Sequence, residues 1–235
     1  KMNGFLRISS NPLISVVMPV HNGERYIEKS IRSVMMQIYD NWELIVIDDG
    51  SVDDTALVAQ SYVDKYPDKF ILIKNEKNMG LNYTLNHCLK YADTKYVARM
   101  DGDDISLPER LEKEFDFLES HPEYAIVSTP MIYFDEKGDF KTGKNEGEPR
   151  LDSFVRGTPF VHAPCMVRRE AYTAVSGYSV SDKRLRVEDW DEQTCQRFIE
   201  VLNQRKQENN TYYFSDILHL ALRILGEVKS DGTYE

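Results

Sequence analysis

Short runs of apolar residues alternate with helical patterns between Leu13 and Ser128, and this alternation is the feature that most constrains the fold. The runs are rich in Ile and Val and nearly unbroken, as in parallel strands that are buried on both faces. The runs are Leu13–Pro19, Trp42–Asp48, Phe70–Lys74 and Tyr96–Met100. Strands that alternate with helices form a mostly parallel sheet with right-handed crossovers. The sequence therefore predicts an α/β fold, Rossmann-like, with helices on both faces of the central sheet.

A helical pattern follows each predicted strand. Tyr26–Gln37 carries one apolar stripe, which predicts a helix that packs on the sheet. Ser51 and Asp54 match a capping box, with Ser51 as the N-cap of the second helix. The third helix is marked by Leu81, Leu85, Cys88 and Leu89. Pro108 suits the first turn of the fourth helix, which we expect to end before Pro122.

The pattern changes after Ser128, so we expect three parts, residues 1–128, 129–191 and 192–235. The sequence of the second part predicts a mixed sheet, with a hairpin that begins at Met131. A strand at Cys165 is expected to pass into a helix that ends at Gly177. Apolar residues return at helical spacing in 198–203 and 214–228. The last of these patterns fits a core helix or a homodimer contact better than a membrane-surface helix, because few basic residues surround it.

Charge and composition exclude several classes of function. The chain has 39 acidic and 29 basic residues, a net charge of −10, whereas binding to nucleic acid needs a field of Lys and Arg. Its longest apolar run, Leu13–Val20, is broken by Ser15 and Pro19 and is far shorter than the roughly 20 residues of a membrane helix. Residues 1–11 lack an apolar signal core, and the three cysteines are far apart. We expect a cytoplasmic protein, either free or at the cytoplasmic face of a membrane.

Acidic clusters stand where two of the predicted strands end. Asp48-Asp49-Gly50 closes the second strand, and Asp101-Gly102-Asp103-Asp104 closes the fourth. Ligands of parallel sheets bind at the carboxyl ends of the strands, so we expect these carboxylates to be unpaired and to form a cation site or an acid/base site. Oxygen-only ligands suit Mg²⁺ or Mn²⁺. The alternative is structural: Asp-Gly is a common turn, and Asp residues often cap helices.

Several common motifs are missing from the sequence. No G-x-G-x-x-G follows the first strand, where Pro19-Val20-His21-Asn22-Gly23 stands, and no G-x-x-x-x-G-K-[ST] occurs. Neither H-E-x-x-H nor G-x-S-x-G is present. These absences argue against dinucleotide oxidoreductases, P-loop NTPases, the common zinc proteases and the serine hydrolases.

Five motifs follow one another along the sequence. They are Pro19-Val20-His21-Asn22, Asp48-Asp49-Gly50-Ser51, Asn78-Met79-Gly80-Leu81, Arg99 to Asp104 with Pro108-Glu109-Arg110-Leu111, and Glu188-Asp189. In this order and spacing, over roughly Pro12 to Asp191, they closely resemble family 2 glycosyltransferases of the GT-A fold. The resemblance implies that residues 1–128 bind a nucleotide-sugar donor and that residues 129–191 form the acceptor side and carry the catalytic base.

The resemblance also implies roles for single residues on the donor side. Asp103 would ligate a Mn²⁺ or Mg²⁺ ion that bridges the diphosphate, and Asp101 would contact the ribose or take part in the metal site. Contacts to the nucleotide, expected to be UDP, would come from Pro19, Val20, Glu24, Asp48, Asp49, Asn78, Gly80, Asp101 and Gly102.

On the acceptor side, the resemblance implies that Asp189 is the general base and that Glu188 positions it or the acceptor. His162 and Trp190 would line the acceptor cleft. The reaction would be a direct displacement that inverts the anomeric carbon, with a glycan or a lipid-linked molecule as acceptor and a role in cell-surface polysaccharide synthesis. The polar stretch Glu192–Arg197 departs from the family pattern, which leaves the role of the last 44 residues, 192–235, open.

Two other functions remain open from the sequence. A phosphatase of the haloacid dehalogenase class also uses Asp-x-Asp with Mg²⁺, although on an early strand rather than the fourth. A module that binds nucleotide sugars or glycans without turnover would also fit the irregular end of the chain.

Overall fold

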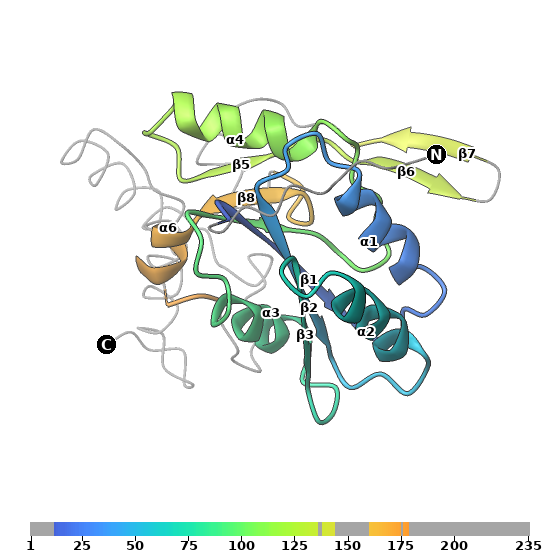
Figure 1. The fold of residues 1–235 in the computed structure, drawn as a ribbon. Coiled ribbons are helices and arrows are strands. Elements are labelled where there is room, and N and C mark those ends of the chain that lie inside the picture. The colour runs from blue at the N-terminus through green and yellow to red at the C-terminus, as the bar shows by residue number, and fades with distance from the viewer. Residues whose placement is uncertain (1–11, 136–137, 144–159, 175, 179–235) are drawn as a thin grey trace, which may run out of the picture.

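The computed structural model describes residues 12–135, 138–143, 160–174 and 176–178 (Figure 1). All predicted parallel strands are present, as β1 (Ile14–Val20), β2 (Trp42–Asp48), β3 (Phe70–Lys74) and β4 (Tyr96–Arg99). β1 lies between β2 and β4, and these pairs and the β2–β3 pair are parallel. Predictions for Glu188, Asp189, Trp190 and residues 192–235 lie outside the described residues.

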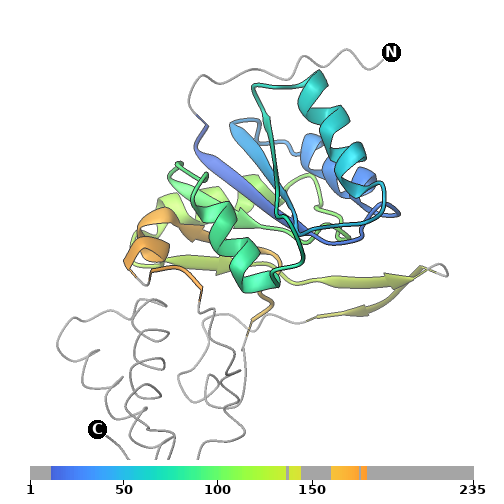
Figure 2. The same ribbon diagram turned by 90° about the horizontal axis from the view of Figure 1, so that it is seen from below.

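The sheet becomes mixed in the second half of the chain, as predicted. Its strand order is β3-β2-β1-β4-β8-β5. β8 (Cys165–Arg168) lies antiparallel between β4 and β5 (Ile126–Ser128). A separate hairpin, β6 (Ile132–Asp135) and β7 (Gly138–Thr142), extends away from this sheet in both views (Figures 1 and 2).

Helices cover both faces of the sheet, because the side chains of each strand alternate between two cores. On one face, Val16 and Met18 pack with α1 (Ile27–Met35), α2 (Thr55–Lys65) and α4 (Arg110–Ser120). On the other face, Val17, Ile45 and Ile47 pack with α3 (Leu81–Leu89) and α6 (Arg169–Ala174). Burial on both faces explains the unbroken apolar strands. In the described parts of the chain, no helix has the length and apolar character needed to cross a membrane.

Two predicted helix starts are wrong. α2 begins at Thr55, and Ser51 does not cap it. The Ser51 hydroxyl accepts the Asn22 backbone N–H at 2.8 Å, while the N–H of Thr55 is accepted by Asp53 Oδ1 at 3.1 Å. Pro108 precedes α4 rather than lying in its first turn, and its carbonyl accepts the N–H of Ile38 at 2.9 Å. In both cases the residue predicted at the start of the helix is hydrogen-bonded to a distant segment instead.

Candidate functional site

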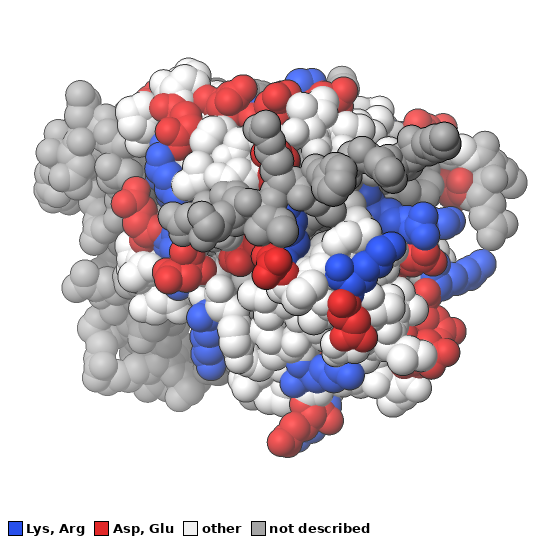
Figure 3. Space-filling view, viewed as in Figure 1, with Lys and Arg blue, Asp and Glu red and all other residues white. Residues whose placement is uncertain are grey.

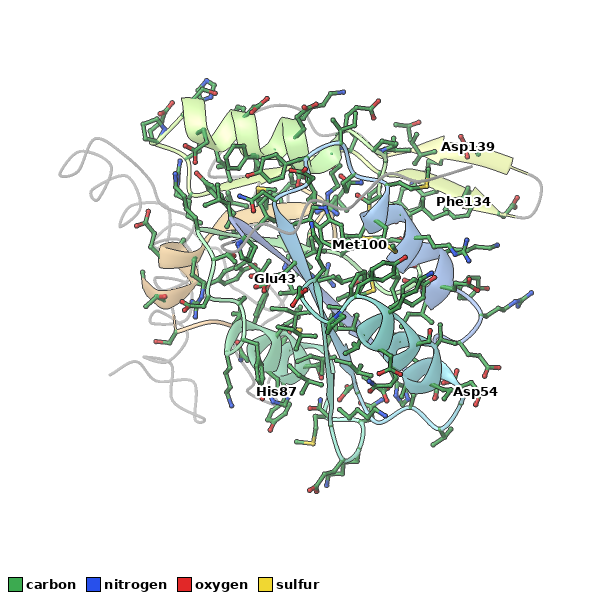
Figure 4. The ribbon with its side chains drawn as sticks, viewed as in Figure 1. Glu43, Asp54, His87, Met100, Phe134 and Asp139 are labelled. Carbon is green, nitrogen blue, oxygen red and sulfur yellow. The ribbon has the colours of Figure 1, made fainter. Side chains whose placement is uncertain are left out.

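The carboxyl ends of β1, β2 and β4 meet at one edge of the sheet, and the predicted site residues follow them. Val20, the last residue of β1, is in register with Asp48, the last residue of β2. Met100, labelled in Figure 4, directly follows β4. It donates its N–H to the carbonyl of Val17 at 3.1 Å. The structure therefore brings together the motifs that follow these three strands.

Reciprocal hydrogen bonds join the loop after β1 to the loop after β2. Asn22 donates its N–H to Ser51 Oγ at 2.8 Å, and its Oδ1 accepts the N–H of Val52 at 3.0 Å. Asn22 holds a left-handed conformation, with φ 51°. Glu24 accepts the N–H of Asp54 through Oε2 at 3.0 Å, although its side chain is exposed. These two loops form one wall of the site.

Asp49 holds the loop that follows β3. Its carboxylate accepts hydrogen bonds from Asn75 Nδ2 at 2.7 Å, from the N–H of Met79 at 2.8 Å and from the N–H of Gly80 at 3.0 Å. Burial alone raises the pKa of this carboxyl, but the hydrogen bonds outweigh it and lower the pKa below its usual value. Asp49 is 5% exposed, so its carboxylate is largely enclosed by protein donors.

Gly50 allows this loop to lie against the turn after β2. Its φ is +69°, and a Cβ at this position would lie 2.4 Å from the carbonyl carbon of Lys77 and 2.6 Å from the nitrogen of Asn78. Only glycine fits this conformation and this contact without strain. Asp48, 3% exposed, accepts the N–H of Ser51 at 3.0 Å, which closes the same turn.

The turn after β4 packs directly on the end of β1. Gly102 is buried, and a Cβ there would lie 2.9 Å from the Cβ of Val20. The hydroxyl of Ser30 in α1 donates to the Gly102 carbonyl at 2.9 Å. A larger residue at position 102 would displace Val20 or the turn, so glycine is needed for this close approach.

The three aspartates of this turn differ in their surroundings. Asp103 is exposed. Asp104 is partly buried, and burial together with the charges of Asp101 and Asp103 raises its pKa to about 6. Burial also raises the pKa of Asp101, while Arg99 opposes this effect. The expectation of unpaired carboxylates is wrong for Asp101, whose Oδ1 accepts Arg99 Nη2 at 2.7 Å.

A divalent metal fits this turn only together with other ligands. Within the described ranges, no group of three or more His, Cys, Asp or Glu residues could hold a metal ion. Mg²⁺ and similar divalent ions commonly bind one or two protein carboxylates and complete their coordination shell with phosphate oxygens and water. The oxygen-only donors Asp101 and Asp103 fit that arrangement, and Asp103 is accessible to it.

His162, predicted on the acceptor side, lies in a cluster of aromatic residues. Its Nε2 is 3.2 Å from the hydroxyl of Tyr178, which is 2.7 Å from the hydroxyl of Tyr172. Burial, and secondly the charge of Arg99, lowers the pKa of His162 to about 4. The imidazole is therefore neutral at physiological pH and can exchange hydrogen bonds but not supply charge.

A pocket of about 620 Å³ lies beside the aspartate turn. Apolar residues from three segments line it: Ile105 after the turn, Ile132 and Phe134 of β6, and Pro164 before β8. Phe134 and Asp139, which both line it, lie on the hairpin strands in Figure 4. Asp104 also borders the pocket, so an apolar compartment adjoins the acidic edge.

Comparison with known proteins identifies the family. Residues 15–175, more than half of the chain, match the family model described as Glycosyl transferase family 2. The chain belongs to this family. The family indicated by the sequence motifs and the predicted GT-A type fold are thus confirmed.

Curated relatives agree with this family 2 assignment. The putative glycosyltransferase EpsE of Bacillus subtilis is 43% identical over 184 residues, covering 78% of this chain and 66% of EpsE. The amylovoran biosynthesis glycosyltransferase AmsE of Erwinia amylovora is 31% identical, covering 71% of this chain and 64% of AmsE. The chain therefore spans slightly less than two thirds of the length of these relatives.

Solved structures share the fold of this family 2 chain. The mannosyltransferase PcManGT from Pyrobaculum calidifontis, in complex with GDP-Man and Mn²⁺, aligns with a TM-score of 0.56 and 19% identity, covering 74% of this chain and 49% of PcManGT. TarS 1–349 of S. aureus in complex with UDP-GlcNAc aligns with a TM-score of 0.54 and 21% identity, covering 70% and 48%.

Sequence reasoning missed two residues that organise the site of this family 2 chain. Asn75 bridges Asp49 and His87, with its Oδ1 2.8 Å from His87 Nδ1. Asn75 lies directly after β3, at the same sheet edge, and this position could have indicated a role in the site. The second residue is Arg99, which belongs to one of the sequence motifs but was assigned no role. Residues 99 and 101 are two apart, and this spacing places their side chains on the same side of an extended chain.

Proposed function

We propose that the chain is an inverting glycosyltransferase that moves a sugar from a nucleotide-diphosphate donor to a glycan or lipid-linked acceptor. The observation that carries this proposal is the meeting of the Asp48–Ser51 turn, the Asn78–Gly80 loop and the Asp101–Asp104 turn at one sheet edge in a member of family 2. Ligands of such sheets bind at this edge, at the carboxyl ends of the parallel strands.

The donor in this proposal is UDP-linked. Pro19, Val20, Glu24 and Asp48 would face the uridine, while the Asn78–Gly80 loop and Gly102 complete the pocket. TarS structures contain UDP and UDP-GlcNAc, and WfgD of Escherichia coli, 38% identical over 106 residues, is named as a UDP-Glc-dependent enzyme. PcManGT contains GDP-Man, so a guanosine donor is the alternative to be tested. Asp49, engaged by the loop after β3, would act mainly by shaping the pocket.

A Mn²⁺ or Mg²⁺ ion would be held by Asp103, with Asp101 beside it, together with the donor diphosphate. When bound, such an ion supplies positive charge that stabilises the departing diphosphate. The chain itself has a net charge of −10, so it offers an anionic donor little attraction of its own. The presence of Mn²⁺ in the PcManGT complex supports this assignment.

Asp189 would take the proton of the acceptor hydroxyl as it attacks the anomeric carbon, with Glu188 positioning it. Side-chain bases typically contribute about 10²–10⁴-fold to such steps. Trp190 and the neutral His162 would contact the acceptor. Attack from the face opposite the departing diphosphate inverts the configuration of the transferred sugar.

We place this activity in polysaccharide synthesis, at the cytoplasmic face of the membrane or free in the cytoplasm. The names of AmsE and of the putative teichuronic acid biosynthesis glycosyltransferase TuaG of Bacillus subtilis, 36% identical over 107 residues, support this process. A homodimer and a peripheral membrane contact remain parts of the proposal that depend on residues 192–235.

The test is a donor panel with metal removal. Purified chain is incubated with UDP and GDP sugars, Mn²⁺ and candidate acceptors, and nucleotide release and glycosylated product are measured. Asp103→Ala and EDTA are each expected to abolish turnover, whereas Asp68→Asn, an exposed acid remote from the site edge, retains it. Asp189→Asn is expected to lower kcat by about 10²–10⁴-fold and to leave UDP affinity unchanged.

Other outcomes would overturn the proposal. Turnover that survives both EDTA and Asp103→Ala contradicts the metal site. UDP binding without transfer or donor hydrolysis supports the module that binds without turnover. Release of phosphate from simple phosphomonoesters, with no use of nucleotide sugars, supports the phosphatase, which family 2 membership already disfavours.

A further inference from the structure

Two arginines and a glutamate form a buried hydrogen-bonded network behind the aspartate turn. Arg99, the last residue of β4, is 4% exposed and donates from Nη2 to Asp101 Oδ1 at 2.7 Å. Arg110 of α4 donates from Nη2 to the Arg99 carbonyl at 2.7 Å and from Nε to Glu114 Oε1 at 3.1 Å. The side chains of Arg110 and Glu114 are 8% and 0% exposed, so this network of hydrogen bonds runs from the core to the site edge.

Packing alone does not explain these charges. Buried ion pairs are often no more stabilising than apolar residues of the same volume, because both charges lose their hydration. In the described part of the chain, Arg99 Nε and Glu114 Oε2 have no hydrogen-bond partner, which adds to that cost. A core that only needed to be filled would be served better by Leu or Met. The arrangement therefore points to a role in specifying geometry.

The geometry at the end of β4 shows what is specified. The Arg99 carbonyl is held by Arg110 on one side, and the next residue, Met100, donates its N–H to Val17 on the other. The backbone that leads into the aspartate turn is thus fixed on both sides. Arg99 then fixes the carboxylate of Asp101, whose side chain is 33% exposed at the edge of the site.

We propose that Arg99, Arg110 and Glu114 are positioning residues that hold the Asp101 carboxylate in the orientation needed to bind the donor. Three aspartates occur within four residues of this turn, and their charges repel. Arg99 offsets that repulsion from the protein side, which leaves the solvent side free for the metal and the diphosphate. This inference rests on the proposed donor role of Asp101, and it assigns a function to three buried residues behind that aspartate.

The test compares Glu114→Gln, which replaces the carboxyl group with an amide at nearly constant shape, with Asp116→Asn, which makes the same replacement at an exposed position of α4. Thermal unfolding reports folding, calorimetric titration reports the affinity for UDP with Mn²⁺, and kinetics separate KM from kcat. Loss of a hydrogen-bond partner behind a metal-ligating side chain typically lowers metal affinity or activity by about 10–100-fold. We expect folded Glu114→Gln to lose UDP affinity by about 10-fold or more, and Asp116→Asn to match the wild type.

A second variant guards against misfolding. Arg99→Lys keeps a positive charge next to Asp101 but replaces the guanidinium, whose Nη2 donates to Asp101 Oδ1, with a shorter side chain that ends in an ammonium group. If Glu114→Gln does not fold, the same loss of UDP affinity in folded Arg99→Lys supports the inference. Unchanged UDP affinity and KM in the folded variants, with only a lower melting temperature, overturns it in favour of a structural role. If the wild type and Asp116→Asn themselves bind no nucleotide, the proposed function fails instead.

Discussion

The aspartates at the edge of the sheet differ in what surrounds their carboxylates. Asp49 accepts three protein donors, Asp48 accepts one from its own turn, and Asp103 is exposed. A carboxylate that is satisfied inside the protein stabilises the local backbone, whereas an exposed one is available to a cation or a ligand. The same residue type therefore shapes the pocket at one position and is free to bind at another. The sequence predicted the cluster but not this division, because the partners come from distant segments.

At this scale His162 predicts a pH dependence of stability. Its pKa in the folded protein is about 4, below the usual 6.5, so the folded state binds fewer protons than the unfolded state between these values. The stability that His162 contributes is complete above pH 6.5 and is lost as the pH falls toward 4. The loss is at most about 1.4 kcal/mol per pH unit, and less in practice because the residue is partly exposed.

Urea unfolding of the wild type and His162→Gln at pH 7.5 and pH 5 tests this prediction. Glutamine does not titrate, so the free energy of unfolding of the wild type is expected to fall relative to the variant as the medium is acidified. Other groups, including Asp104, titrate in the same range, but they are common to both proteins and cancel in the difference. Parallel pH profiles for the two proteins would show that His162 is not held neutral by the fold.

At the scale of elements, sequence patterns predicted what depends on local periodicity. β2 and β3 occur over the predicted residues, because strands buried on both faces need unbroken apolar runs. The antiparallel position of β8 between β4 and β5 was not predicted. Its pairs join residues such as Tyr96 and Arg168, and no local pattern reports a partner 72 residues away. The start of α2 was wrong for a related reason, since Ser51 is engaged by another loop.

A buried hydrogen bond joins the start of α2 to the loop after β1. Thr55, the first residue of α2, is fully buried, accepts the N–H of Gly23 through Oγ1 at 2.7 Å and donates to Asp53. Thr55→Val keeps the shape but leaves that N–H without its acceptor, a loss that costs about 1–3 kcal/mol. Ser61→Ala, on the exposed side of the same helix, is the control. Equal unfolding free energies for the two variants would mean that the hydrogen bond does not hold the loop.

At the scale of the whole molecule, the site belongs to no single element. Its walls come from the loops after β1, β2, β3 and β4, which the parallel sheet brings to one edge. This convergence was predictable, because parallel strands direct their carboxyl ends to the same side. The catalytic base remains a prediction at Asp189, outside the described residues. A ligand that contacts several of these loops stabilises the sheet as a whole, so ligand binding is linked to global unfolding.

The charge of the protein affects which ligands can bind at this edge and stabilise the folded state. The net charge is −10, and acidic side chains gather along the edge formed by α4 (Figure 3). A diphosphate approaching the aspartate turn meets repulsion unless a divalent cation screens it. We therefore expect UDP alone to stabilise the protein little, and UDP with Mn²⁺ to stabilise it strongly.

The expected size of this effect follows from mass action. A ligand at 100 times its Kd stabilises the folded state by about 2.7 kcal/mol. For a chain of this length, each kcal/mol raises Tm by about 2–4 °C, so saturation with UDP and Mn²⁺ is expected to raise Tm by about 5–10 °C. Thermal scans with UDP, with Mn²⁺, with both, and with both plus excess EDTA measure it. The Asp103→Ala variant is expected to show only the small shift of UDP alone; an equal shift in EDTA would mean that donor binding at this edge needs no metal, because the loops alone would then overcome the charge of the turn.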